Sequence, residues 1–231
     1  SSAASDVYKR QGEEFKHNEY RMKNIYGDYI WVLIRTATLR DKEGNPLKIV
    51  GVILDIDRAK KSEQQLTTRA SFDALTELYN RETIESQIDN EITLSEARKS
   101  EMAVLFIDVD DFKHYNDQYS HATGDQVLKF VARTIKGTVN EFGFAGRYGG
   151  DEFIACIRNA EINDPTRAAQ DIISKLEEGF ECDGVHLTVS VSIGISMIKD
   201  DYNTRVEYII GKADDAMYSV KKNGKSNYAF I

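Results

Sequence analysis

The pattern of apolar and polar positions divides this chain into two parts. Between residues 12 and 57, apolar stretches are separated by polar turn clusters such as 41–46, which predicts antiparallel β-structure. From about residue 73 onward, strand-like segments alternate with segments of helical periodicity, which predicts α/β (α+β) structure. We expect strands at 102–108, 143–148, 152–157 and 187–197, and helices at 80–98, 124–138, 165–180 and 206–222.

Two of the expected strands differ in the number of faces that we expect to be buried. Residues 102–107 form a continuous apolar run, which is typical of a strand buried on both faces. Residues 187–195 alternate apolar with mostly small polar positions, which predicts a strand with one covered face.

The segment 147–153, Arg-Tyr-Gly-Gly-Asp-Glu-Phe, predicts a tight hairpin with acids at its tip. Gly149 and Gly150 lack Cβ atoms, so they allow positive φ and let a large ligand approach the backbone. Asp151 and Glu152 beside this gap suit a divalent metal and a phosphate-bearing substrate. The alternative is a plain glycine hairpin whose acids are solvated.

A second acidic cluster follows the apolar run at 102–107. Asp108, Asp110 and Asp111 come directly after it, and α/β folds place ligand sites at the ends of such strands. The alternative is a set of helix caps, because Asp favours helix starts and loops. That alternative explains Asp110 and Asp117, but it accounts poorly for the whole set.

Charge and composition narrow the classes of function. The 231 residues carry a net charge of −8, which argues against a general nucleic-acid or membrane-surface binder. The two cysteines, Cys156 and Cys182, form no metal-binding or disulfide pattern. No apolar run reaches membrane-spanning length, so we expect a cytoplasmic fragment without membrane contact, whose full-length protein could be anchored upstream.

The first eleven residues need separate treatment. Residues 1–11 back-translate to a transposase adapter used in sequencing libraries, so we expect them not to be native. In that case the beginning of the natural protein is missing upstream of Gly12. The alternative is an ordinary polar N-terminus.

Four ordered motifs, at 73–81, 108–117, 149–153 and 213–225, resemble those of the GGDEF family of diguanylate cyclases. The resemblance covers about residues 70 to 231. It implies a domain at 73–231 with a central five-stranded sheet flanked by helices, similar to the core of class III nucleotide cyclases. It also implies an enzyme that joins two GTP molecules into cyclic di-GMP and releases two pyrophosphates. The alternative is a non-catalytic GTP-binding receptor of the same fold, although such domains typically have a damaged name motif.

The resemblance implies roles for the acids. Asp108, the Val109 carbonyl and Asp151 would hold Mg²⁺ or Mn²⁺, since hard cations prefer oxygen ligands. Asp151 and Glu152 would be catalytic, with the division between metal binding and proton transfer left open. Lys113 would add positive charge to the site.

The same resemblance implies the nucleotide contacts. Asn116 and Asp125 would read guanine, because their side chains match the donors and acceptors of its edge. Leu75 and Leu128 would pack against the base, and Gly149 and Gly150 would contact the nucleotide at the hairpin. The phosphates would be bound by the backbone of Asp111, Phe112 and Lys113 and by the side chains of Lys221 and Lys225. The lysines near the chain's end also fit a basic helix terminus that complements the helix dipole.

Residues 12–57 resemble the C-terminal half of a PAS sensor domain, in which Trp31 is expected to pack in a core. Residues 58–72 predict a helical linker, with Ile56, Ala59, Leu66 and Ala70 near heptad positions. A dimerising connector and a single solvated helix both remain open from the residues alone. The family resemblance favours a homodimer through the cyclase domains and the linker, each domain holding one GTP.

Many family members carry an inhibitory Arg-x-x-Asp site shortly before the name motif. Here Asn140 and Gly143 occupy those two positions. Asn supplies no guanidinium and Gly no carboxylate, so we expect no product-inhibition site of that type.

Overall fold

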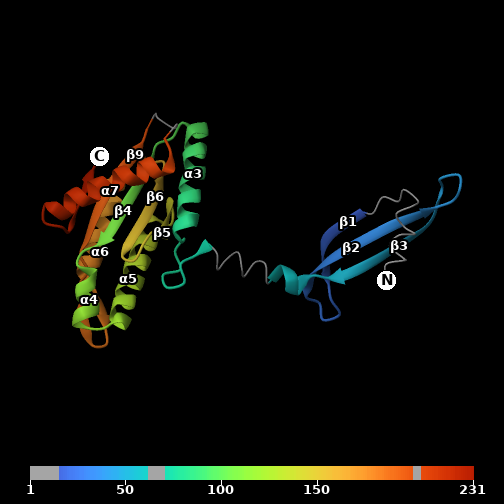
Figure 1. Ribbon diagram of the computed structural model, residues 1–231, viewed down its shortest axis with the longest axis horizontal. Coiled ribbons are helices and arrows are strands. Elements are labelled where there is room, and N and C mark those ends of the chain that lie inside the picture. Colours follow the sequence, from blue (N-terminus) through green and yellow to red (C-terminus); the bar gives the residue numbers. More distant parts are fainter. Residues whose placement is uncertain (1–15, 62–70, 200–203) are drawn as a thin grey trace. The chain divides into compact units, whose positions relative to one another are not determined.

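The computed structural model describes residues 16–61, 71–199 and 204–231. The chain divides into two compact units, residues 1–68 and 69–231 (Figure 1). The predicted adapter at 1–11 and the linker residues 62–70 lie outside the described residues, so both assignments stay predictions. In the described ranges, no helix combines the length and the apolar character that a membrane span needs.

The N-terminal unit contains a three-stranded antiparallel sheet, as its turn clusters predict. Strands β1 (Lys16–Lys23), β2 (Tyr29–Arg40) and β3 (Pro46–Asp55) pair in chain order. Asp41 shapes the second turn, because its Oδ1 accepts hydrogen bonds from the backbone N–H groups of Glu43 and Asn45.

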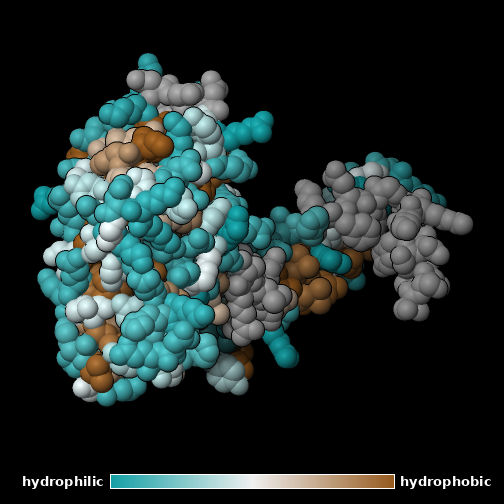
Figure 2. All heavy atoms as spheres, turned by 60° about the vertical axis from the view of Figure 1, so that its left-hand side comes forward, coloured by the Kyte–Doolittle hydropathy of each residue, from teal (hydrophilic) through white to brown (hydrophobic). Residues whose placement is uncertain are grey.

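This sheet leaves many large apolar side chains at its surface. Strand β3 is exposed along nearly its whole length, and Ile49, Val52 and Ile53 are each more than half exposed. Brown spheres mark apolar residues of this unit in Figure 2. The described part of the N-terminal unit therefore covers little of its own apolar surface.

The C-terminal unit is built on a five-stranded sheet in the order β10-β9-β4-β6-β5. Its strands are β4 (Met102–Val109), β5 (Gly143–Arg147), β6 (Glu152–Arg158), β9 (Val191–Ile198) and β10 (Asn227–Phe230). Only β10 and β9 pair in parallel; the other neighbours are antiparallel. The main helices are α3 (Arg81–Arg98), α5 (His121–Val139), α6 (Pro165–Glu178) and α7 (Val206–Lys222). This confirms the mixed α/β fold with a central five-stranded sheet (Figure 1).

Helices cover both faces of this sheet. Alternate residues of β4, including Leu105 and Ile107, pack in one core with α5 and α6. The residues between them, including Val104 and Phe106, pack in a second core with α3 and α7. Every residue of β4 is buried, which confirms the expectation from its continuous apolar run.

The strand expected at 187–197 differs from the prediction. The structure has a short β8 (Val185–Leu187), which pairs with β7 (Phe180–Cys182), and then β9, which is buried on both faces. The small residues of β9 face helix α7 rather than solvent: a Cβ on Gly194 would overlap the Ala213 carbonyl oxygen. The expectation of one covered face is wrong because small residues there permit close helix packing.

Candidate functional site

The C-terminal end of β4 carries the first candidate residue. Asp108 lies in the ladder between Glu152 of β6 and Ser192 of β9, and it is only 6% exposed. Its Oδ1 lies 2.7 Å from Nζ of Lys221, in the last turn of α7. The structure thus brings a predicted metal ligand and a predicted phosphate-binding lysine into direct contact.

The hairpin between β5 and β6 presents the second group of acids. Its turn closes through the Gly149 N–H, which donates to the Glu152 carbonyl at 3.2 Å. The Asp151 carbonyl accepts a hydrogen bond from the Val109 N–H at 3.1 Å. This bond holds the hairpin tip beside the end of β4, so the tip acids lie next to Asp108.

The two glycines of the hairpin matter because they have no side chain, and not because of their backbone conformation. Glycine allows positive φ, but neither Gly149 nor Gly150 lies in the left-handed region. A Cβ at Gly149 would overlap the Glu152 Oε2, whereas one at Gly150 would meet no atom within 4 Å. Gly149 therefore makes room for a catalytic candidate, and Gly150 leaves the turn open to a ligand.

Burial and the charges of neighbouring acids raise the pKa of Asp108 and of Glu152. Burial is the main cause that raises the pKa of Asp108 to about 6; Lys221 opposes the rise, and the charges of Asp151 and Glu152 add to it. Burial also raises the pKa of Glu152, followed by the charges of Asp151 and Asp214. The site therefore gathers more negative charge than its environment readily solvates.

A divalent cation fits this donor set. Among the described residues, no group of three or more His, Cys, Asp or Glu side chains is arranged to hold a metal. The predicted set needs two carboxylates, Asp108 and Asp151, with the Val109 carbonyl, and Mg²⁺ commonly takes its other ligands from phosphates and water. The Lys221 ammonium on Asp108 shows that a positive charge is already favourable at this position.

The turn between β4 and α4 (Phe112–Gln118) is the predicted phosphate end of the candidate site. Asp111 has φ 53°, and its side chain makes no capping hydrogen bond to α4. Instead, both of its carboxylate oxygens lie 2.7 Å from Lys225 Nζ. Lys113 is exposed in the first turn of α4. The interpretation of Asp110 as a helix cap is wrong, because its Oδ1 accepts a hydrogen bond from Ser192 Oγ on β9.

The two predicted guanine readers come from adjacent helices. Asn116 lies on α4, and Asp125 lies near the N-terminus of α5, just after its first turn and next to Gly124. A Cβ at Gly124 would overlap Asn116 Oδ1 and lie 3.3 Å from the Phe112 ring. Gly124 therefore has a role that the sequence did not reveal, since its missing side chain leaves the space for the Asn116 amide.

The two leucines predicted at the base differ in exposure. Leu128 is 2% exposed and belongs to the core beneath α5. Leu75 packs against the same core but is only partly buried. Leu75 therefore retains surface that a base could cover, whereas Leu128 lies in the packed interior.

Arg147, just before the two glycines of the hairpin, connects the motif at 73–81 with the motif at 149–153. Its Nη1 lies 3.2 Å from Asp73 Oδ1, and its Nη2 donates to the Gly150 carbonyl at 2.6 Å. Asp73 also accepts hydrogen bonds from the Thr76 hydroxyl and backbone N–H. The motif spacing gave no sign of this bridge, which forms between segments that are distant in sequence.

The structure explains why glycine occupies position 143, where the usual inhibitory pair has its Asp. A Cβ there would overlap the Cys156 carbonyl oxygen of the neighbouring strand β6. Asn140 is the C-cap of α5, which ends at Val139, and its backbone N–H donates to the Lys136 carbonyl. The close pairing of β5 and β6 therefore leaves no space for a carboxylate at residue 143.

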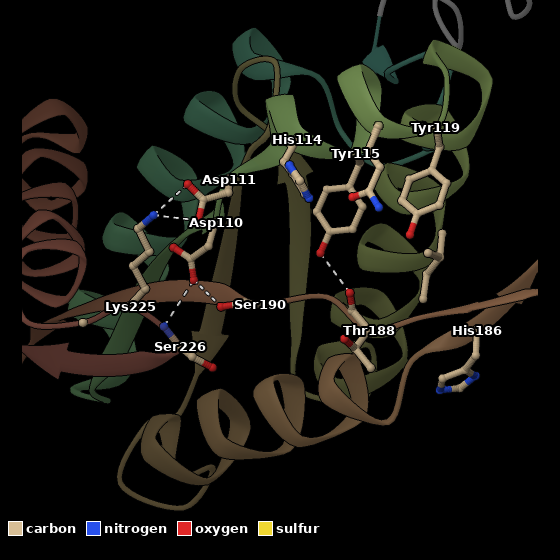
Figure 3. Close-up of a pocket in the computed structure, with 13 residues that line it drawn as sticks. Asp110, Asp111, His114, Tyr115, Tyr119, His186, Thr188, Ser190, Lys225 and Ser226 are labelled. Carbon is tan, nitrogen blue, oxygen red and sulfur yellow. Dashed lines mark hydrogen bonds and ion pairs between the residues drawn. The ribbon is translucent and has the colours of Figure 1, made fainter.

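A cavity of about 470 Å³ lies beside α4 (Figure 3). His114, Tyr115 and Tyr119 line one wall, and Asp111 and Lys225 lie at one end. Neither Asn116 nor Asp125 is among the residues that line it. The cavity therefore reaches the phosphate end of the candidate site but not its base end.

Comparison with known proteins identifies two families along the chain. The profile of the family "Diguanylate cyclase, GGDEF domain" matches residues 70–227, and that of "PAS fold" matches residues 2–53. The second match includes residues 2–11, so the assignment of residues 1–11 to an adapter stays a prediction.

Curated relatives share the C-terminal unit. The signaling protein YkoW of Bacillus subtilis is 34% identical over 178 residues, which cover 76% of this chain and 22% of YkoW. Diguanylate cyclase A of Treponema denticola is 38% identical over 136 residues, covering 58% of this chain and 36% of the relative. The chain thus spans only about a fifth to a third of the length of these relatives.

A solved structure shows the same fold. The GGDEF domain of YfiN (TpbB) from Pseudomonas aeruginosa superimposes with a TM-score of 0.65 at 33% identity, covering 69% of this chain and 93% of that one. The family profile matches more than half of the chain, and its range contains all four motifs up to residue 225. This chain therefore belongs to the GGDEF-domain family of diguanylate cyclases, with part of a PAS fold preceding the GGDEF domain.

Proposed function

We propose that this chain is a diguanylate cyclase that joins two GTP molecules into cyclic di-GMP and releases two pyrophosphates. The observation that carries the proposal is the cluster at the end of β4, where Asp108 and the hairpin acids meet Lys221. Lys225 lies beside the adjacent phosphate turn. Family membership supports the same reaction.

The triphosphate would bind at the turn after β4. Lys221 and Lys225 each hold a carboxylate in the nucleotide-free protein, and both would transfer to the β- and γ-phosphates. The backbone N–H groups of Phe112 and Lys113 begin α4 without a capping side chain from Asp111, so they can donate to a phosphate. The Lys113 side chain would add charge at the same turn.

The guanine base would bind between α4 and α5. The Asp125 carboxylate can accept from guanine N1–H and N2–H, and the Asn116 amide can serve O6 or N3. Leu75 would pack on the base from its exposed side, with Leu128 supporting it from the core. Adenine would leave the Asp125 carboxylate unpaired, which is the kind of mismatch that gives strong discrimination.

In the reaction, the 3′-oxygen of one GTP would form a bond to the α-phosphorus of the other. The bond between that phosphorus and the bridging oxygen would break, and pyrophosphate would leave. A divalent cation on Asp108, the Val109 carbonyl and Asp151 would neutralise charge on the reacting phosphates. Asp151 or Glu152 would take the hydroxyl proton, and burial, which raises the pKa of Glu152, makes its carboxylate a stronger base.

Each domain holds the residues for one nucleotide, so two domains would face each other to complete the reaction. We propose that the enzyme acts as a homodimer of half-sites, with the PAS part and the linker acting on the geometry of pairing. No catalytic residue would need to change for such control, because it alters only how the two halves meet.

The direct test incubates the protein with GTP and Mg²⁺ and separates the products by chromatography. The expected product is cyclic di-GMP, and Asp151→Ala should reduce its formation more than about hundredfold, since one preorganised charged group commonly contributes about 3 kcal/mol. Asp171→Ala, on the exposed side of α6, is the matched control and should retain activity. Tight GTP binding by the wild type without any product would instead identify a non-catalytic receptor.

A further inference from the structure

Asp110 is a buried acid that the proposed reaction does not use. It follows β4 directly and is 4% exposed. Its Oδ1 accepts a hydrogen bond from Ser192 Oγ at 2.7 Å, and its Oδ2 accepts from Ser190 Oγ and from the Ser226 backbone N–H, the latter at 3.2 Å. Figure 3 shows Asp110 between the segment that carries Ser190 and the loop that carries Lys225 and Ser226. One carboxylate therefore connects the end of β4 to two other segments.

The loop after α7 has an unusual backbone conformation. Gly224, Lys225 and Ser226 have φ values of 114°, 63° and 45°, so three consecutive residues have positive φ. This region is unfavourable for residues with a Cβ, and such a conformation persists only where the surroundings hold it. Hydrogen bonds hold it here: Lys225 N–H donates to the Val220 carbonyl at 3.1 Å, Ser226 N–H donates to the Asp110 carboxylate, and Ser226 Oγ donates to Glu177 Oε1 at 2.8 Å.

The conformation of this loop decides where Lys225 points. Its Nζ reaches the Asp111 carboxylate, at the turn that begins α4. We propose that Asp110 is a positioning residue, whose carboxylate holds the Ser226 N–H and thereby fixes the strained loop that directs Lys225 to the phosphate end of the nucleotide site. This inference rests on the proposed function, in which Lys225 binds the triphosphate.

A carboxylate suits this task better than a neutral side chain. Three donors converge on it, and a hydrogen bond to a charged acceptor is stronger than one between neutral groups, the more so in a buried setting. The two serine hydroxyls fix the orientation of the carboxylate. The acceptor offered to Ser226 is therefore held by β9, a central strand, rather than by the loop itself.

The test compares the affinity for GTP with that for GMP, because both carry guanine but only GTP reaches Lys225 through its outer phosphates. Asp110→Ser shortens the side chain and removes the contact with Ser226, so the preference for GTP should fall about tenfold. Asp110→Asn keeps an acceptor at the same place and should restore most of that preference. Asp117→Ser, an exposed acid on α4, is the matched control and should leave it unchanged.

A double-mutant cycle separates positioning from general damage. If Asp110 acts through Lys225, then Asp110→Ser has little further effect on the GTP-to-GMP ratio in a Lys225→Met background. Additive effects, or an unchanged ratio in folded Asp110→Ser, would overturn the proposal. If that variant does not fold, amide exchange in the nucleotide-free wild type decides: protection of the Ser226 N–H supports the proposal, and exchange at the rate of an unstructured peptide overturns it. Failure of the proposed function would give a different result, because the wild-type protein itself would then make no cyclic di-GMP.

Discussion

Lys221 Nζ and Asp108 Oδ1 lie 2.7 Å apart, in an ion pair between the last turn of α7 and the end of β4. One partner is proposed to bind phosphate and the other to bind a divalent metal. In the nucleotide-free protein the charges of these two side chains neutralise each other. Metal binding must separate the pair, and the released ammonium is then available to the triphosphate, so metal and nucleotide should favour each other's binding.

The first prediction follows from this competition. Lys221→Met should increase the affinity for Mn²⁺ in the absence of nucleotide, by about tenfold, because no ammonium then has to be displaced from Asp108. The same substitution should weaken GTP binding. Mn²⁺ binding can be followed by electron paramagnetic resonance without any turnover. Lys222→Met removes the same charge from the neighbouring exposed residue and is the matched control; equal effects of both variants would contradict the prediction.

The second prediction concerns the cost of keeping Asp108 ionised. Its pKa is raised to about 6 from an ordinary value of 3.8, chiefly by burial. Between these values the folded state binds more protons than the unfolded state, so this group makes the metal-free protein more stable as pH falls from about 7 to about 4. Asp108→Asn should therefore abolish activity and yet raise the melting temperature at pH 7.5.

Thermal unfolding in the presence of a chelator checks that prediction. The advantage of Asp108→Asn over the wild type should shrink as the pH is lowered toward 4, where the wild-type carboxyl is neutral as well. A variant that melts below the wild type at pH 7.5 would show instead that the ion pair with Lys221 outweighs the penalty of burial.

A third prediction concerns the choice of base. The wild type should bind GTP at least about a hundredfold more tightly than ATP, because adenine cannot satisfy Asp125. Asp125→Ala should reduce that ratio more than it reduces affinity for the triphosphate in general. Competition binding with both nucleotides measures the ratio. Equal affinity of the wild type for GTP and ATP would refute the guanine-reading role.

A fourth prediction follows from the half-site arrangement. Activity per chain should rise with protein concentration, since a single domain supplies residues for only one nucleotide. Specific activity measured over a wide dilution series should fall toward zero as the dimer dissociates. A flat profile, together with a monomer in analytical ultracentrifugation, would contradict the proposed dimer.

The fifth prediction concerns regulation by product. Added cyclic di-GMP should slow the reaction only at concentrations where it competes at the active site, because Asn140 and Gly143 supply neither charge of the usual inhibitory pair. Progress curves with added product measure this. Tight non-competitive inhibition that disappears in Asn140→Ala would show the prediction wrong. Restoring the acid with Gly143→Asp should lower the melting temperature, because even a Cβ overlaps the Cys156 carbonyl.

The longer elements of the C-terminal unit could be predicted from sequence because their patterns are long and regular. The apolar run at 102–107 became the fully buried β4, and the acids after it lie at the candidate site. The short elements α4, β7, β8 and β10 were not predicted, since three to seven residues are too few to show a period. Their positions depend on tertiary contacts, such as the pairing of β10 with β9.

Two predictions made from residue types were wrong: the role of Asp110 and the exposure of one face of β9. Asp110 resembles a helix cap in sequence, but its partners are Ser190, Ser192 and Ser226, which lie about 80 to 116 residues further along the chain. Helix α7 approaches β9 closely at Gly194, so the apparent alternation of that strand did not report solvent exposure. Both errors come from packing between distant segments, which local pattern does not record.

The overlap that a side chain at Gly124 would make with the Asn116 amide has a consequence for changing base preference by design. The two positions cannot be optimised one at a time. A residue other than glycine at 124 displaces the Asn116 amide, so a change at one position alters the space available at the other. Substitutions there should show strong epistasis, so libraries that vary 116, 124 and 125 together should yield altered nucleotide preferences that single-site libraries miss.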